Sequence, residues 1–155
     1  MGRIAQRLQE LGLVLPAPLT PPPDVTLLFP WVNVRDGRAF VSGHGPLDPD
    51  GTLAEPRGRV GEAVSVEAAV ELARRTGLAM LGSLQAELGD LDRIAGWARV
   101  FGMVNSAPGF DRQPQVINGF SELIVEVFGA EIGRHSRSAV GMNALPFGIA
   151  VEILS

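Results

Sequence analysis

The sequence predicts an α+β fold in which a mixed β-sheet carries two long helices on one face. Two long segments have apolar residues at helical spacing, and five shorter ones are rich in β-branched and aromatic residues. Their order along the chain is β-β-α-β-α-β-β, and strands interrupted by only two helices favour helices packed on one side of a sheet. With 155 residues, 46% of them hydrophobic, the chain suits one domain with a buried core.

The first segment predicts a short amphipathic helix over residues 3–11, which ends near Gly12. Its apolar residues at helical spacing are Ile4, Leu8, Leu11 and Leu15. Five of the eight residues in 16–23 are proline, so we expect an extended surface strap that tethers this helix to the body. We therefore divide the chain into an N-terminal helix with a proline-rich strap, residues 1–23, and one folded domain, residues 24–155.

The domain opens with a predicted β-hairpin. Residues 27–34 and 38–42 have strand composition, and Arg35-Asp36-Gly37 between them is a good hairpin turn. Residues 44–59 are rich in Gly, Pro and Asp and predict a loop.

Two helices and three further strands complete the prediction. Ser65 can cap a helix that runs to about residue 87, and Pro114 suits the first turn of a second helix that ends near Phe128, before Gly129. We expect the core-facing residues of these helices to be Val66, Val70, Ala73, Gly77, Met80, Leu84 and Leu88, and Val116, Phe120, Leu123, Ile124 and Val127. The remaining predicted strands are residues 94–104, 136–142 and 149–154. Two helices leave one sheet face uncovered, so we expect self-association.

Composition excludes several classes of function. A formal net charge of −4 disfavours a nucleic-acid surface, which rests on clustered Lys and Arg. The chain has no cysteine and only two histidines, so we expect no disulfide, no thiolate chemistry and no metal site. No segment has the pattern of a signal peptide or a membrane span, and we expect a cytoplasmic protein.

A candidate site lies in the last twenty residues. Arg137 and Glu152 stand on two strand-like segments that flank Leu145-Pro146, and antiparallel pairing of these segments would bring the two side chains together. Arginine can hold a substrate carboxylate through two parallel hydrogen bonds, and a nearby glutamate can activate a water. The alternatives are a surface or subunit-interface ion pair for Arg137 and an ordinary strand glutamate at Glu152.

Several short motifs resemble the RidA family, also called the YjgF/YER057c/UK114 proteins, and its longer subgroup with an N-terminal helix, which is often assigned as endoribonuclease L-PSP. They occur in family order across the whole chain. They are Phe40-Val41-Ser42-Gly43, the 46–51 loop, Gly89-Asp90-Leu91-Asp92-Arg93, Val116-Ile117-Asn118-Gly119, His135-Ser136-Arg137-Ser138-Ala139-Val140, Leu145-Pro146 and Val151-Glu152-Ile153.

The resemblance implies a chorismate mutase-like fold for residues 24–155 and a homotrimer whose sheets form an inner barrel. It also implies ligand sites for small carboxylic acids in the clefts between subunits. In the best-understood branch of this family, enzymes hydrolyse reactive enamines and imines to 2-keto acids and ammonia, and family members typically need no metal or organic cofactor. We therefore expect such a deaminase, and no cofactor. A non-catalytic binder of keto acids is the alternative, and an endoribonuclease is disfavoured by the acidic charge.

The resemblance also assigns roles to single residues. Arg137 matches the carboxylate-binding arginine and Glu152 the residue that holds the hydrolytic water. Ser42 and Gly43 match a strand end that contacts the ligand, and Asn118 matches a helix asparagine that lines the site. Alternatively, Ser42 is only a polar strand end, and Asn118 a helix residue bonded to nearby backbone.

Three further residues with aromatic rings, Trp31, His44 and His135, have different expected roles. Trp31 stands where relatives have a tyrosine, and an indole can donate a hydrogen bond but not accept one. The chain has no tyrosine at all, which favours the binding alternative. His44 stands where the family often has glutamine and is either a second proton-transfer group or a loop residue. His135 is expected only to support Arg137.

Overall fold

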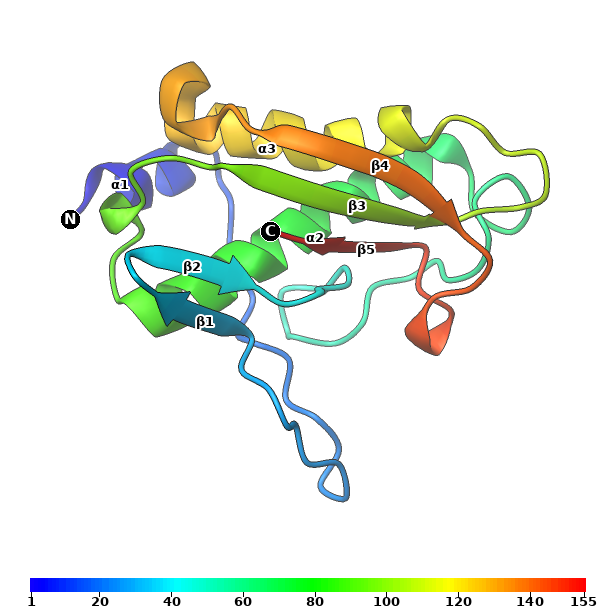
Figure 1. The fold of residues 1–155 in the computed structure, drawn as a ribbon, viewed down its shortest axis with the longest axis horizontal. Helices are drawn as coiled ribbons and strands as arrows, with labels where there is room; N and C mark the ends of the chain where they lie inside the picture. The colour runs from blue at the N-terminus through cyan, green and yellow to red at the C-terminus, as the bar shows by residue number, and fades with distance from the viewer.

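The computed structural model describes residues 1–155 and confirms the predicted order of helices and strands (Figure 1). The predicted bounds of the two long helices and of the strand at 136–142 agree with it to within a few residues. In chain order the elements are α1 (Arg3–Glu10), β1 (Val32–Arg35), β2 (Arg38–Val41), α2 (Val66–Leu88), the 3₁₀ turn η1 (Leu91–Arg93), β3 (Arg99–Asn105), α3 (Gln113–Gly133), β4 (Ser136–Met142), the 3₁₀ turn η2 (Pro146–Gly148) and β5 (Val151–Leu154).

The strands form one layer in the order β4-β3-β5-β2-β1. Strand β3 runs parallel to β4 and antiparallel to β5. The β1–β2 hairpin joins the free side of β5, because Val41 exchanges two backbone hydrogen bonds with Ser155 and His44 exchanges two with Ile153. The mixed sheet of the prediction is therefore confirmed.

A β-bulge interrupts the pairing between β2 and β5. Between the two bonded pairs, Ser42 and Gly43 stand on one side and Leu154 alone stands opposite. Two residues against one is the definition of a bulge, and such bulges are frequent beside functional sites.

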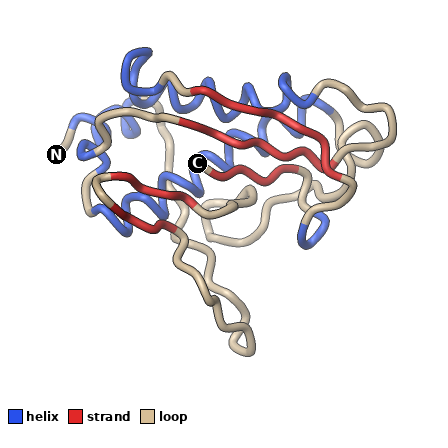
Figure 2. The backbone as a smooth tube through the Cα atoms, viewed as in Figure 1, coloured by secondary structure: helices blue, strands red, loops and turns tan.

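Helices α2 and α3 both pack on one face of the sheet, as predicted (Figures 1 and 2). They approach each other closely at two glycines. A Cβ at Gly77 would lie 2.7 Å from Leu123 Cδ2, and one at Gly119 would collide with the carbonyl oxygen of Val70. All five residues predicted to face inward from α3 are buried.

The opposite sheet face carries no helix, and we call it the open face. Val100 and Val104 are fully buried under the helices, and a Cβ at Gly102 would lie 2.7 Å from Ile117, so these residues point to the helical layer. Because side chains alternate along a strand, the odd-numbered residues of β3 from 99 to 103 point to the open face. Phe40 is 53% exposed and Leu154 is 40% exposed.

Two predicted strands begin five residues later than expected, and the last strand begins at Val151 instead of residue 149. Strand β1 begins at Val32 instead of residue 27, because Pro30 lacks an N–H donor and the chain before it projects from the body, with Leu28 93% exposed (Figure 2). Strand β3 begins at Arg99 instead of residue 94, because the indole of Trp97 packs edge-on against two rings of α3. These rings belong to Phe120 and Phe128.

The N-terminal helix is held by a side chain from far along the sequence. The carboxylate of Asp92 accepts hydrogen bonds from the backbone N–H groups of Arg3 (2.6 Å) and Ile4 (2.8 Å). These bonds lower the pKa of Asp92. Ile4 and Leu8 are buried on the inner face of α1. No helix combines the length and the apolar character that a bilayer crossing requires.

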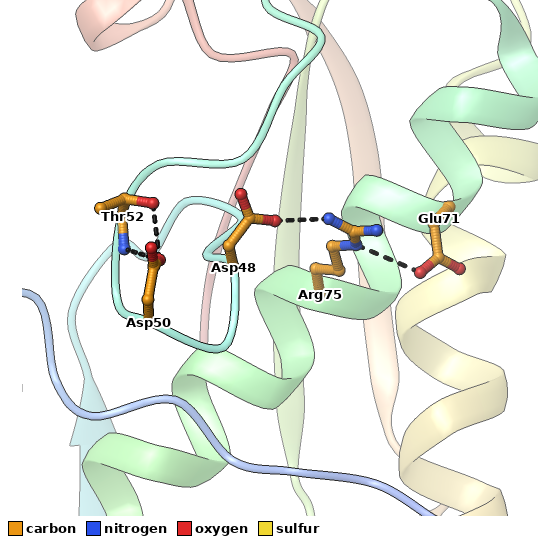
Figure 3. A network of polar contacts seen from close by, with 5 residues as sticks. All are labelled: Asp48, Asp50, Thr52, Glu71 and Arg75. Atoms are coloured by element: carbon orange, nitrogen blue, oxygen red, sulfur yellow. Dashed lines mark hydrogen bonds and ion pairs between the residues drawn. The ribbon is translucent and has the colours of Figure 1, made fainter.

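The loop after the bulge is fixed to α2 by an ionic network (Figure 3). Arg75 Nη1 donates to Asp48 at 2.6 Å, and its Nε donates to Glu71 at 3.3 Å. Within the loop, the carboxylate of Asp50 accepts from both the N–H and the hydroxyl of Thr52. These contacts give the loop a defined path between the sheet and α2.

Candidate functional site

Arg137 lies on β4, the edge strand of the sheet, and its side chain reaches the surface of α3. It pairs with Val100, so it points to the helical side of the sheet. Its Nη1 donates to Ser121 Oγ at 2.9 Å and its Nη2 donates to the carbonyl oxygen of Pro114 at 3.0 Å. Burial lowers the pKa of the guanidinium, and none of the ion pairs in the structure includes it. It is thus a partly buried cation without a carboxylate partner.

Asn118 lies on the face of α3 that Arg137 contacts. Pro114, Asn118 and Ser121 follow each other at spacings of four and three residues, so they share one face of α3. Arg137 contacts the first and the last of them, which places Asn118 between its two anchors. The carboxamide of Asn118 is exposed and makes no hydrogen bond within the chain, so it can serve a ligand.

The outer edge of β4 adds unpaired backbone donors to this region. The N–H of Ser136 and the carbonyl of Met142 bond toward the β3 side. Because backbone groups alternate sides along a strand, the N–H groups of Arg137, Ala139 and Gly141 point away from β3. A carboxylate bound by Arg137 at this edge can therefore also accept a backbone hydrogen bond.

Glu152 occupies a different place, on β5 beside the bulge. It pairs with Met103 and so points to the open face. A Cβ at Gly43 would lie 2.6 Å from Glu152 Oε1, so the carboxylate rests directly against the backbone of the bulge. Burial raises the pKa of Glu152, and the carboxylate makes no hydrogen bond or ion pair within the chain. The structure therefore places Glu152 against Gly43, and Ser42 precedes this glycine in the same bulge.

The expectation that Arg137 and Glu152 meet on adjacent strands is wrong. Strand β3 lies between β4 and β5, and the two side chains point to opposite faces of the sheet. The reason is that η2 carries the chain past β3 before β5 begins, so Leu145-Pro146 does not close a hairpin. The chain thus holds two separate groups, which we call the arginine half-site (Arg137, Asn118 and Ser121) and the glutamate half-site (Glu152, Ser42 and Gly43).

The side-chain donors of Trp31 and Ser42 are both bonded to backbone carbonyl oxygens of the same chain. The indole Nε1 of Trp31 donates to the carbonyl of Leu19 at 3.2 Å, and the hydroxyl of Ser42 donates to the carbonyl of Pro30 at 2.8 Å. The Trp31 ring also lies 5.2 Å from the His44 ring and 5.8 Å from the Phe29 ring. Trp31 thus connects the proline-rich strap to the chain next to the bulge.

The two histidines differ from each other. His44 is buried, its Nδ1 lies 2.6 Å from the Ser42 carbonyl, and its Nε2 lies 2.8 Å from Ser83 Oγ on α2. Burial lowers the pKa of His44, and the bond to Ser42 partly offsets this. Both ring nitrogens are occupied within the protein, which favours a structural role. His135 contacts Ser121, a residue that the sequence analysis missed, although its spacing from Asn118 on α3 was a usable signal.

Two surface hollows include neither Arg137 nor Glu152. One lies between α1 and α3 at Arg3 and Gly129, and the other lies at the β1–β2 turn by Arg35 and Phe40. The first hollow contains Glu126, which is paired with Arg74 at 2.9 Å, and the second contains Asp36 of the exposed hairpin turn. Neither hollow joins an unpaired buried cation or carboxylate, so the two half-sites remain the better candidates.

Comparisons with known proteins agree with this architecture. No family model matches the chain. Protein TCP17 of Trypanosoma cruzi is 41% identical over 152 residues, which cover 98% of this chain and 91% of that protein. The crystal structure of Atu1372 from Agrobacterium tumefaciens, a protein of unknown function, is 38% identical, with a TM-score of 0.84 over 97% of this chain and 88% of that one. A protein of Shewanella oneidensis assigned as an endoribonuclease is 24% identical, with a TM-score of 0.88 over 97% and 95% of the two chains.

The fold also matches YyfA of Yersinia pestis, a member of the Rid protein family, with a TM-score of 0.57 at 20% identity over 85% of this chain and 88% of that one. The chain belongs to the RidA family. Its architecture is the chorismate mutase-like fold of RidA proteins. The TM-scores are higher for the structures from A. tumefaciens and S. oneidensis than for YyfA.

Proposed function

We propose that this RidA protein is an enamine and imine deaminase, which hydrolyses reactive 2-imino acids to 2-keto acids and ammonia without a cofactor. The observation that carries the proposal is the pair of half-sites. A cation without an acidic partner suits the carboxylate of the substrate, and an unbonded carboxylate of raised pKa suits proton exchange with water. The solved structure of E. coli TdcF, which has a similar fold at 16% identity, contains bound serine, itself a small carboxylic acid.

The separation of the half-sites supports a site shared between two copies. We propose a homotrimer in which the arginine half-site of one subunit faces the glutamate half-site of the next. The open face offers an apolar surface for this assembly, formed by Phe40, Phe101, Met103, Val140 and Leu154. Burying such exposed apolar area is favourable by about 25 cal/mol per Å². Within one copy, the sheet itself keeps Arg137 and Glu152 apart.

The proposed reaction needs only these groups. Arg137 and the free edge of β4 hold the carboxylate, and Asn118 orients the remainder of the substrate. Glu152 accepts a proton from water as the water oxygen bonds to the iminium carbon, which gives a tetrahedral carbinolamine. Glu152 then returns the proton to the amine nitrogen. The carbon–nitrogen bond breaks and ammonia leaves, while the hydroxyl becomes the keto oxygen and gives its proton to Glu152, which releases it to solvent. An enamine first accepts a proton at its terminal carbon and enters the same path as the imine.

The first test is hydrolysis of an imine generated in situ by an amino acid oxidase, with semicarbazide as a competing trap. We expect the wild-type protein to accelerate imine loss and Arg137→Ala to abolish the acceleration. Arg134→Ala is the matched control, because Arg134 lies in the same segment and its side chain makes no hydrogen bond or ion pair. If wild-type protein accelerates no imine, the deaminase proposal is wrong.

The second test asks whether the site is shared. Arg137→Ala and Glu152→Gln subunits, each inactive alone, are mixed by co-expression. In mixed trimers roughly a quarter of the shared sites pair an intact arginine with an intact glutamate, so activity should return. No recovery in verified mixed oligomers would contradict a site built from two copies.

A non-catalytic binder of small keto acids is the second candidate. One observation favours it: the indole N–H of Trp31 is bonded to Leu19, so no side chain at this position is free to hydrogen-bond a substrate or water. Such a protein would bind pyruvate through Arg137 but would not accelerate imine loss. An endoribonuclease is less favoured because of the net charge of −4, and a strongly salt-dependent RNA affinity would support it.

A further inference from the structure

Arg137 is the end of a chain of hydrogen bonds that runs through α3 to the turn before β4. Its Nη1 lies 2.9 Å from Ser121 Oγ, which lies 2.9 Å from His135 Nε2. On the other side of the ring, His135 Nδ1 lies 2.7 Å from the carbonyl oxygen of Gly133. No acidic residue takes part in this series of hydrogen bonds, so the orientation of the Arg137 side chain depends on the directions of the bonds.

Elementary chemistry fixes these directions. A carbonyl oxygen only accepts, so His135 Nδ1 carries the proton that bonds Gly133. In the neutral ring Nε2 is then an acceptor, and the hydroxyl of Ser121 donates to it. With its hydrogen turned toward His135, Ser121 Oγ presents a lone pair to Arg137, which can only donate. Each group thus determines the orientation of the next.

The far end of this chain is itself rigid. A Cβ at Gly133 would lie 2.8 Å from the carbonyl oxygen of Ile124, so only glycine allows the backbone to approach α3 this closely. The His135 ring also packs edge-on against Phe120, with ring centroids 6.0 Å apart, and Phe120 is fully buried. The imidazole is therefore held by the core on one side and by Gly133 on the other.

Two anchors on α3 orient the guanidinium of Arg137. Pro114 and Ser121 are seven residues apart, about two turns of α3, and each terminal nitrogen of the guanidinium bonds to one of them. Acceptors on two different turns favour the hydrogens of Nη1 and Nη2 that point apart. In that arrangement the two parallel hydrogens at the tip of the guanidinium stay free, and this pair is the one that binds both oxygens of a carboxylate.

We propose that Ser121 and His135 are positioning residues that, together with Pro114, aim the free fork of Arg137 at the substrate carboxylate. We call Pro114, Ser121 and His135 the arginine clamp. This inference rests on the proposed function, because it gives the clamp a role only if Arg137 binds a carboxylate. It extends the function to two residues that do not touch the substrate and act through the arginine.

The test compares Ser121→Ala with Ser121→Thr, which restores a hydroxyl at the same position. We expect the alanine variant to raise the dissociation constant for pyruvate and the KM for imine on the order of tenfold, a normal coupling within one hydrogen-bond network. We expect kcat to change little and the threonine variant to bind nearly as wild type. In an Arg137→Ala background, Ser121→Ala should have no further effect on pyruvate affinity.

A spectroscopic measurement tests the clamp independently of activity. In protein with ¹⁵N-labelled histidine at neutral pH, we expect the His135 ring to show a protonated Nδ1 and an unprotonated Nε2. A proton on Nε2, or an unchanged dissociation constant in Ser121→Ala, would overturn the clamp while leaving the proposed function in place. Wild-type protein that neither binds pyruvate nor hydrolyses imines would overturn both.

Discussion

The two half-sites of this RidA protein are built by opposite means. The arginine half-site is held by hydrogen bonds: two of the guanidinium donors are anchored on α3, and a further chain of bonds orders one of the acceptors. The glutamate half-site contains a carboxylate with no hydrogen bond, which lies against the backbone of a glycine. One group is fixed in direction, and the other is confined only by shape and burial.

This difference corresponds to the different tasks that we propose for the two groups. A residue that binds a carboxylate binds more tightly when its fork is rigid, because the side chain loses its conformational entropy on folding and not on binding. A residue that exchanges protons with water gains from a carboxylate whose oxygens are not already bonded and whose pKa lies closer to neutral pH. A substitution at each half-site should therefore change a different kinetic parameter.

The largest expected effect is on kcat in Glu152→Gln. The amide cannot accept the proton from water, so kcat should fall by roughly a thousandfold, within the range of general acid–base catalysis, while KM stays near the wild-type value. Steady-state kinetics with in situ imine measures both values. Glu122→Gln, at an exposed position on α3, is the control. A raised KM with an unchanged kcat would mean that Glu152 binds substrate instead.

Arg137→Lys should produce the complementary result. Lysine keeps the charge but cannot form two parallel bonds or satisfy Ser121 and Pro114 together, so KM should rise by about a hundredfold. The same variant should bind pyruvate correspondingly more weakly in calorimetry. Retention of wild-type affinity would show that charge alone holds the carboxylate.

Gly43→Ala tests whether shape alone confines Glu152. The new methyl group would lie 2.6 Å from Glu152 Oε1 and would displace the carboxylate, so kcat should fall by about tenfold with little change in pyruvate affinity. Gly96→Ala is the matched control, because a Cβ there meets no atom within 4 Å. Equal kinetics in the two alanine variants would contradict the proposed contact between the bulge and the active carboxylate.

The smallest effect should be on stability. Burial raises the pKa of Glu152 in the folded state, so its charged form is disfavoured by folding. The linked stability is complete below the unfolded pKa of about 4.3 and is lost as pH rises through the folded pKa. Glu152→Gln should therefore melt at a slightly higher temperature than wild type at pH 7. In calorimetry at pH 3 the difference should disappear, and a lower melting temperature at pH 7 would be the contrary result.

Much of the fold could be predicted because its signals are local. The face of α3 from Val116 to Val127 follows helical periodicity, and the strand at 136–142 was predicted with the bounds that the structure shows. The order of strands in the sheet could not be predicted from local sequence. Leu145-Pro146 resembles a hairpin turn, whereas the pairing of β4 and β5 with β3 depends on long-range packing.

The residues of the candidate site could also be predicted from local motifs, whereas their arrangement in space could not. The family motifs identified Arg137, Asn118, Glu152 and Gly43, and the structure groups them into two half-sites. The separation into two half-sites could not be predicted. It depends on the position of β3 between β4 and β5, and on which face of the sheet each strand residue points to. Ser121 was missed because a single serine carries no motif of its own, and only its spacing from Asn118 on α3 pointed to it.

The bulge at Ser42 and Gly43 also determines which face of the sheet the residues after it point to. Val41 and His44 are three residues apart, yet both are buried, and His44 reaches Ser83 on α2. In an unbroken strand two residues at this spacing would point to opposite faces. Loss of one residue here would therefore turn His44 outward and break its contact with Ser83. At this point of the chain, the number of residues matters to the fold as much as their identity.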